Sequence, residues 1–112
     1  MNHSQWKTAR TRALLGEAEQ EDAEVTALRL EIRYAMALGQ AVYDRRTVLG
    51  LSTGELAGRA NLTEARIEAI EDGDTVPTLP LLHRLATALE SQLDIHLASG
   101  RAATVRFEPS AA

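Results

Sequence analysis

The stretch LSTGELAGRANLTEARIEAIEDGD, residues 51–74, predicts two short helices joined by a turn. Ser52 followed three residues later by Glu55 has the spacing of a capping box, in which each side chain binds the other's backbone amide at a helix start. Asn61 falls where the chain must turn, and asparagine tolerates the left-handed conformation better than most residues. Thr63 is a suitable N-cap for the second helix. Together, these residues predict two short helices that are joined by a turn at Asn61.

Residues that typically begin or end helices also occur downstream. Gly73 is suited to end the second helix near Asp72, and Pro77 and Pro80 frame the start of another helix near Thr78. Apolar residues recur along one side of each helix, which predicts a shared core. We expect that core to contain Leu56, Ala57, Leu62, Ile67, Ile70, Leu82, Leu85 and Leu89.

Upstream, a long helix is expected from Leu28 to just before Gly50, because apolar and small residues recur every three or four positions. Its predicted apolar face consists of Leu28, Ile32, Ala35, Met36, Gly39 and Val42. Residues 6–15 favour a short amphipathic helix whose apolar face is formed by Trp6, Ala9, Ala13 and Leu14.

Between these helices lies the acidic stretch GEAEQEDAE, which has little apolar content. It is typical of a solvated helix face or a linker, and the alternative is an acidic surface that binds a basic protein partner. The residues of that candidate partner-binding surface are Glu17, Glu19, Glu21, Asp22 and Glu24.

After Leu89, apolar and polar residues alternate at every second position, which predicts a β-hairpin over residues 93–107. The predicted fold is therefore mainly α-helical, with an N-terminal helical and acidic extension (1–27), a central helical domain (28–92), and a C-terminal β-hairpin and tail (93–112). Two strands alone are marginally stable in water, so the hairpin either packs on the helices or pairs with another chain. From this we expect a homodimer.

Composition narrows the class of protein. A chain of 112 residues, 45% of them hydrophobic, can bury one core. It has no cysteine, no secretion-signal pattern and no stretch of about 20 apolar residues, so we expect a cytoplasmic protein that does not span a membrane. The pI of 5.3 argues against non-specific binding to nucleic acid through bulk charge.

No constellation of residues predicts an enzyme, a cofactor or a metal site. His3, His83 and His96 are widely separated, and no pair of them has metal-ligand spacing. The acids near residue 70 are at helical spacing, where solvated surface acids are far commoner than catalytic ones. Gly50 and Gly54 flank a helix start rather than forming a phosphate-binding loop.

The sequence GLSTGELAGRANLTEARIEAIEDGDTVPTLPLLHRLATALE, residues 50–90, resembles the helix-turn-helix of the lambda-repressor/Cro-like (Xre) family. This resemblance implies a regulator that binds operator DNA with the helix after Thr63. The long preceding helix and the following LDIHLA strand are also similar in layout to HigA-type antitoxins. That second resemblance implies an antitoxin-type repressor that also neutralises a basic RelE/HigB-like ribonuclease toxin; the alternatives are a stand-alone Xre-family regulator and a fold used only for protein–protein interaction.

The resemblance also indicates which residues contact DNA. Arg66 is the one residue of the second helix suited to a bidentate contact with guanine, and Glu64 is suited to accept a hydrogen bond from a cytosine amino group. Thr53 stands where the family commonly has glutamine that contacts a phosphate, and it reaches less far. The full set of candidate DNA-binding residues is Arg46, Thr53, Thr63, Glu64, Ala65, Arg66 and Ala69.

The charge of this segment conflicts with that role. Residues 51–74 carry six carboxylates and two arginines, which accounts for the whole formal net charge of −4. Glu68 would be repelled by phosphates, whereas an acid at Glu71 fits a structural function such as an ion pair within the domain. Either a few cations at the rim, with Arg59 and Arg84 as possible helpers, maintain DNA binding, or the surface serves protein recognition.

Overall fold

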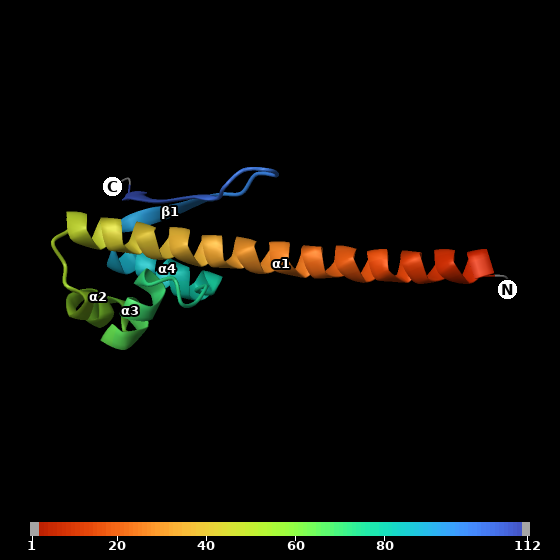
Figure 1. Cartoon of the computed structure of the whole chain (residues 1–112). Coiled ribbons are helices and arrows are strands. Elements are labelled where there is room, and N and C mark those ends of the chain that lie inside the picture. Colours follow the sequence, from red (N-terminus) through yellow and green to blue (C-terminus); the bar gives the residue numbers. More distant parts are fainter. Residues whose placement is uncertain (1–2, 111–112) are drawn as a thin grey trace. The chain divides into compact units, whose positions relative to one another are not determined.

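A computed structural model describes the backbone of residues 3–110 and the side chains of residues 22–110. The chain divides into two compact units, residues 1–30 and residues 31–112. Within the described residues it forms four helices and one antiparallel hairpin (Figure 1), which confirms the predicted mainly helical fold. The elements are α1 (His3–Val48), α2 (Thr53–Ala60), α3 (Glu64–Glu71), α4 (Leu79–Ala88), β1 (Ser91–His96) and β2 (Thr104–Pro109).

Helix α1 is continuous, so the linker considered for the acidic stretch is not present, and neither is a separate helix over residues 6–15. Glutamate, alanine and glutamine are good helix formers, and the single Gly16 costs only about 1 kcal/mol in a helix interior. The apolar face predicted for residues 6–15, like the side chains of Glu17, Glu19 and Glu21, lies outside the described side chains.

The predicted apolar face of α1 is only partly buried. Ala35 and Val42 belong to the core, as do Leu38 and Ala41, which the prediction missed. Leu28, Ile32 and Met36 are 56%, 49% and 60% exposed, so the prediction is wrong for these three side chains. The periodicity indicates which residues share a face of the helix, but it does not show whether another element covers that face.

Gly39 allows α1 to approach α3 closely. A Cβ atom at this position would contact the Ile70 carbonyl oxygen and lie 2.7 Å from the Glu71 carbonyl oxygen. Because both contacts are with backbone, no side chain can move to relieve them. Backbone therefore packs directly against backbone where α1 meets the C-terminal end of α3.

The α2–turn–α3 segment has the predicted local structure. The Ser52 hydroxyl accepts a hydrogen bond from the Glu55 amide, and the Glu55 carboxylate accepts one from the Ser52 amide, so the capping box is present. Asn61 is left-handed, with φ 55° and ψ 48°. The Thr63 side chain caps α3, and Gly73 follows its end with φ +77°.

Of the eight residues predicted for the core, seven are buried, and Leu62 is partly buried against the others. In the hairpin, Leu93 lies opposite Phe107, and both pack against the core together with Val105. Ile95 and Leu97 are 40% and 62% exposed, because only the base of the hairpin is covered. The hairpin is therefore supported by its own chain, which removes the argument that it needs a second copy.

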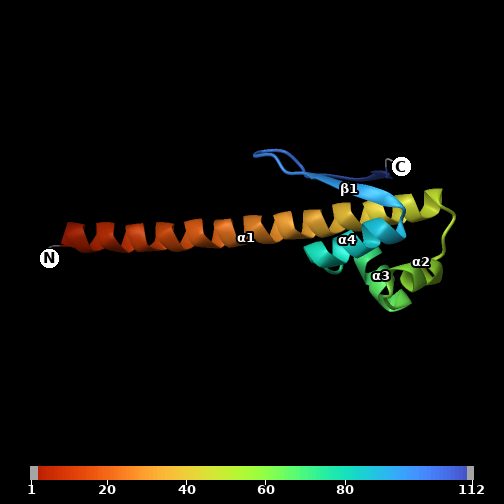
Figure 2. The same ribbon diagram turned by 180° about the vertical axis from the view of Figure 1, so that it is seen from behind.

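Within the unit 31–112, the hairpin lies on one side of the C-terminal part of α1, and α2 and α3 lie on the other (Figures 1 and 2). β1 begins at Ser91, two residues earlier than predicted, after the turn at Leu89 and Glu90 that follows α4. This arrangement leaves the outer surface of α2 and α3 uncovered by the hairpin.

Candidate nucleic-acid interface

Helix α3 is anchored on one side and exposed on the other. Ile67 and Ile70 are fully buried, whereas Glu64, Arg66 and Glu68 are exposed. Ala65 is also exposed, and Ala69 is half-buried. The sequence predicted this division correctly, and it gives α3 a fixed outward surface.

The first residues of α2 and α3 contact each other. The Thr53 hydroxyl donates a hydrogen bond of 2.7 Å to Glu64 Oε1. The sequence analysis did not predict this contact, because the two residues are eleven positions apart and no spacing rule links them. The hydroxyl that the resemblance assigned to a DNA phosphate is thus engaged by a carboxylate of the same chain.

Thr63 also has a structural function, since its hydroxyl oxygen accepts the Arg66 backbone N–H at 3.2 Å. An N-cap hydroxyl can still donate its own proton, so capping and a contact with DNA are compatible. The DNA contacts of Thr53, Thr63, Ala65 and Ala69 stay predictions.

Arg46 forms an ion pair within the domain. Its Nε and Nη2 atoms donate to the two carboxylate oxygens of Glu71, each at 2.8 Å, and Nη1 donates to the Leu51 carbonyl oxygen at 2.9 Å. The two side chains are 14% and 9% exposed, and the guanidinium also lies 5.2 Å from the centre of the Tyr43 ring. The hydrogen bond with Glu71 raises the pKa of Arg46 in spite of the opposing effect of burial.

This pair explains the acid at Glu71, for which the sequence indicated a structural function. It also bears on Arg46 as a candidate DNA-binding residue, because the guanidinium is held inside the domain by three hydrogen bonds. A contact between its remaining N–H groups and DNA stays a prediction.

Three further arginines bind backbone carbonyls near helix ends. Arg84 donates to the carbonyls of Ala60 and Asn61 at the end of α2. Arg59 donates to Ala88, and Arg45 donates to Leu89 and Glu90, at the end of α4. Cations suit these positions because the last carbonyls of a helix lack partners and carry partial negative charge.

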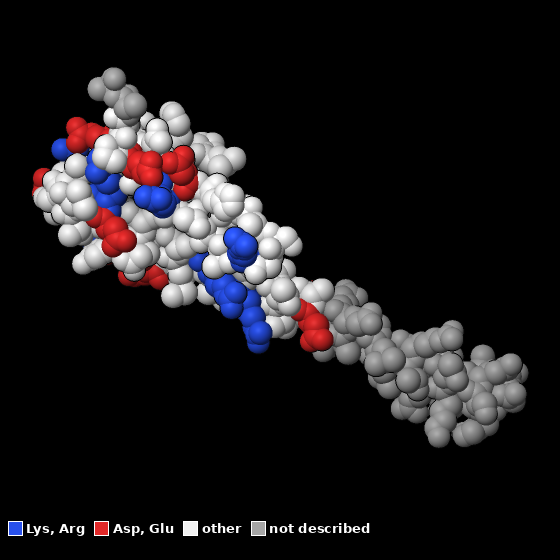
Figure 3. All heavy atoms as spheres, turned by 90° about the horizontal axis from the view of Figure 1, so that it is seen from above, with Lys and Arg blue, Asp and Glu red and all other residues white. Residues whose placement is uncertain are grey.

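Arg59 and Arg84, considered as helpers in DNA binding, thus stabilise the domain. Arg66 differs from them, because its exposed guanidinium has no hydrogen-bond or ion-pair partner among the described residues. Figure 3 shows the side of the molecule that carries the hairpin, where acidic and basic side chains are interspersed at one end and a short run of basic side chains follows further along.

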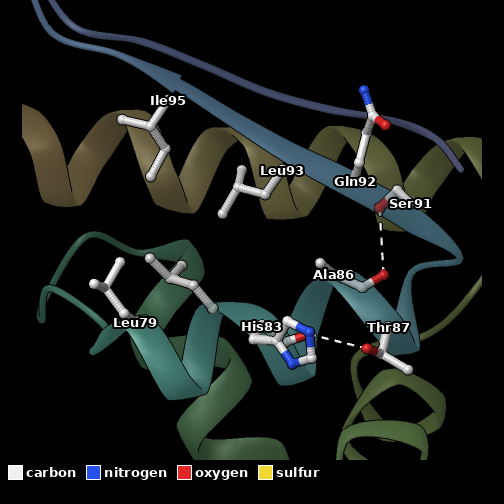
Figure 4. Close-up of a pocket in the computed structure, with 9 residues that line it drawn as sticks. Leu79, His83, Ala86, Thr87, Ser91, Gln92, Leu93 and Ile95 are labelled. Carbon is white, nitrogen blue, oxygen red and sulfur yellow. Dashed lines mark hydrogen bonds between the residues drawn. The ribbon is translucent and has the colours of Figure 1, made fainter.

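A groove of about 480 Å³ lies between α4 and β1 (Figure 4). Its walls are largely apolar and include Leu79, Leu93 and Ile95. The two hydroxyls at its edge are satisfied within the chain, since Ser91 donates to the Ala86 carbonyl and Thr87 to the His83 carbonyl. The groove therefore offers few groups that could orient a polar ligand.

Among the residues that the structure describes, no cluster of three or more histidine or acidic side chains could hold a metal ion. Over the same part of the chain, no helix has the length and apolar character needed to cross a membrane.

The Arg46–Glu71 pair is tested by removing its carboxylate. We expect Glu71→Ala to lower the free energy of unfolding by about 3 kcal/mol, because it leaves a largely buried guanidinium without its counter-charge. Glu68→Ala is the matched control on the exposed side of the same helix and should cost less than about 0.5 kcal/mol. Urea denaturation of both variants measures the difference, and equal losses would contradict a stabilising function for the pair.

The sequence matches a known family of domains. The sequence model of the helix-turn-helix domain family matches residues 21–94, about two thirds of the chain. No curated protein matches the chain. Similar solved structures include the restriction-modification controller protein C.AhdI from Aeromonas hydrophila, with 33% identity over 49% of this chain and 83% of that chain and a TM-score of 0.48. Another is the clp gene regulator ClgR from C. glutamicum, with 28% identity over 52% of this chain and 73% of that chain and a TM-score of 0.47.

The family match spans α2, the turn and α3, the elements whose outer surface the hairpin leaves uncovered. The chain therefore belongs to the helix-turn-helix domain family.

Proposed function

We propose that this protein is a stand-alone regulator of transcription that places α3 in the major groove of its operator. The observation that carries the proposal is the fixed orientation of α3. Ile67 and Ile70 are fully buried while the opposite side of the helix is exposed, so α3 can approach DNA without leaving the core. A major groove about 12 Å wide admits one helix of this kind.

Arg66 is the main base-reading residue in this proposal. Its guanidinium is exposed, has no partner among the described side chains, and has the planar fork that matches the two acceptors of guanine. Arg45, Arg59 and Arg84 are bound to carbonyls of their own chain. Because few cations are available to displace counterions, we expect a shallow dependence of DNA affinity on salt.

Replacing Arg66 tests this placement of α3. Arg66→Ala should weaken binding to the operator by about 1–3 kcal/mol and relax the sequence preference at one base pair in each half-site. Arg101→Ala removes the same charge from the exposed turn of the hairpin and should leave both properties almost unchanged. Fluorescence anisotropy with DNA from upstream of the protein's own gene, at low salt, measures both; equal affinities for the wild type and Arg66→Ala would argue against this placement.

The proposed regulator acts as a homodimer, which doubles the contacts of a weakly basic domain. Val25, Leu28 and Ile32 are exposed and follow one another along α1 at spacings of three and four residues. β-Branched residues at the first and third of these positions, with leucine at the second, favour a parallel two-stranded coiled coil. Glu24 and Arg29 occupy the flanking positions, which face each other across such a dimer.

A charge on this apolar face should separate the two copies. We expect Leu28→Glu to give a monomer, because it places a carboxylate in the interface. Leu30→Glu is the matched control, since Leu30 lies about 200° around the helix from Leu28. Sedimentation equilibrium over micromolar concentrations distinguishes the two variants, and a wild-type protein that is monomeric throughout would refute the dimer.

A second function, neutralisation of a basic toxin, is favoured by one observation. Asp22 and Glu24 belong to the acidic stretch of α1, and both are exposed. Acidic surfaces steer basic partners and accelerate their association. In this case the protein would be an antitoxin-type repressor that binds both operator DNA and a RelE/HigB-like ribonuclease.

This second function requires a small basic protein encoded next to the gene. The variant Asp22→Lys should slow association with that protein several-fold at low salt. Asp94→Lys, which changes an exposed acid of β1, is the control and should have little effect. Surface plasmon resonance provides the rates, and a purified neighbouring protein that does not bind the wild type would exclude the antitoxin function.

A further inference from the structure

We infer that Glu64 selects cytosine in the operator and that Thr53 is the positioning residue that holds Glu64 for this contact. The inference rests on the proposed placement of α3 in the major groove. It is carried by the hydrogen bond between the first residue of α2 and the first residue of α3.

The contact fixes one end of the Glu64 side chain. The distance from Thr53 Oγ1 to Glu64 Oε1 is 2.7 Å, in the short range typical of a hydroxyl that donates to a carboxylate. Thr53 is half-buried and Glu64 is exposed, so the hydroxyl ties an outward-facing group to the body of the domain. An unrestrained glutamate would lose more rotamer freedom on binding DNA.

Gly54 keeps space open beside this carboxylate. A Cβ atom at Gly54 would lie 3.6 Å from Glu64 Oε2, which is ordinary van der Waals contact. The site therefore holds Oε1 in an internal hydrogen bond and leaves Oε2 accessible.

The position of Glu64 at the start of α3 also favours an ionised carboxylate. Glu64 begins α3, where the aligned peptide dipoles stabilise a negative group. An ionised carboxylate has no proton to donate, so it can only accept hydrogen bonds. With Oε1 engaged, Glu64 presents one acceptor to an incoming base pair.

The four base edges differ in how they meet a single fixed acceptor. Cytosine presents one donor, the N4 amino group, in the major groove. Adenine presents its N6 donor next to the N7 acceptor, so a carboxylate that binds N6 is repelled by N7. Guanine presents two acceptors, and thymine presents an acceptor and a methyl group. A lone acceptor thus matches cytosine best.

Two other functions of the pair are conceivable, and each predicts a different result. In one, Thr53 releases Glu64 and donates to a DNA phosphate, which carries no sequence information. In the other, Glu64 simply repels the DNA backbone. Both would change affinity for all sequences alike, whereas the inferred contact changes the preference at one base pair.

The test is selection of bound duplexes from a library with randomised half-sites, carried out with the full chain. The wild type should enrich cytosine at one position in each half-site by roughly tenfold over the other bases. Thr53→Val keeps the shape of the side chain but removes the donor, and it should reduce this enrichment to about threefold or less. Thr53→Ser retains the hydroxyl and should preserve it.

Glu64→Gln completes the experiment, because with its oxygen bound by the Thr53 hydroxyl the amide presents only N–H donors to the base. We expect this variant to lose the preference for cytosine, whose group in the major groove is a donor, and to favour a base that presents an acceptor. The inference is overturned if Glu64→Gln raises affinity equally for all four bases, or if Thr53→Val lowers it equally for all four. If the wild type enriches no sequence at all, the proposed function fails together with the inference, whereas enrichment that depends on Arg66 but not on Glu64 refutes the inference alone.

Discussion

The ion pair between Arg46 and Glu71 is the interaction on which the orientation of α3 depends. Through one guanidinium it joins the last turn of α1, the Leu51 carbonyl just before α2, and the final residue of α3. An eight-residue helix is too short to be stable alone in water. Its position therefore has to come from tertiary contacts, namely this pair, the backbone contact at Gly39 and the buried side chains of Ile67 and Ile70.

Contacts within the domain also change how the net charge of the segment 51–74 is understood. Of its six carboxylates, Glu71 is neutralised by Arg46, Glu55 closes the capping box of α2, and Glu64 accepts a hydrogen bond from Thr53. Half of the acids thus have partners within the domain. Only Glu71 is neutralised, because its partner is a cation, whereas Glu55 and Glu64 bind neutral donors and keep their charge. A charge count along the sequence therefore overstates the repulsion between this segment and a polyanion by the one carboxylate that Arg46 balances.

The arginines show the complementary effect. A count of basic residues suggests that Arg45, Arg59 and Arg84 could contact phosphates, but each donates to backbone carbonyls near a helix end. Carbonyls at these ends have no partner in their own helix, so a nearby guanidinium satisfies them. The hydrogen bonds from arginine side chains to helix-end carbonyls thus stabilise the short helices and, at the same time, leave few cations free.

The features that sequence analysis predicted well depend on neighbours within a few residues. The capping box at Ser52, the left-handed Asn61 and the N-cap at Thr63 are all of this kind, and all three are present. The core of the domain was also predicted, because helical periodicity identifies the inward face of a short amphipathic helix.

The features that were missed depend on tertiary contacts. The hydrogen bond between Thr53 and Glu64 joins the starts of two helices, and the partner of Glu71 lies 25 residues away. Neither distance in sequence corresponds to a helical or strand repeat. The exposure of Ile32 and Met36 was missed for a related reason, since a periodic pattern does not reveal whether a partner surface exists.

The geometry of α3 explains how so few polar residues could suffice for recognition. At about 100° per residue, Glu64 and Arg66 lie roughly 200° apart around the helix, on opposite flanks of its exposed face. Ala65, Glu68 and Ala69 lie between them. The two alanines are small enough to permit a close approach to the floor of a groove, whereas Glu68 adds a second carboxylate to the exposed face. In the proposed placement, one flank presents only an acceptor and the other only donors. Two such residues on opposite flanks reach different base pairs, so each specifies a position independently of the other.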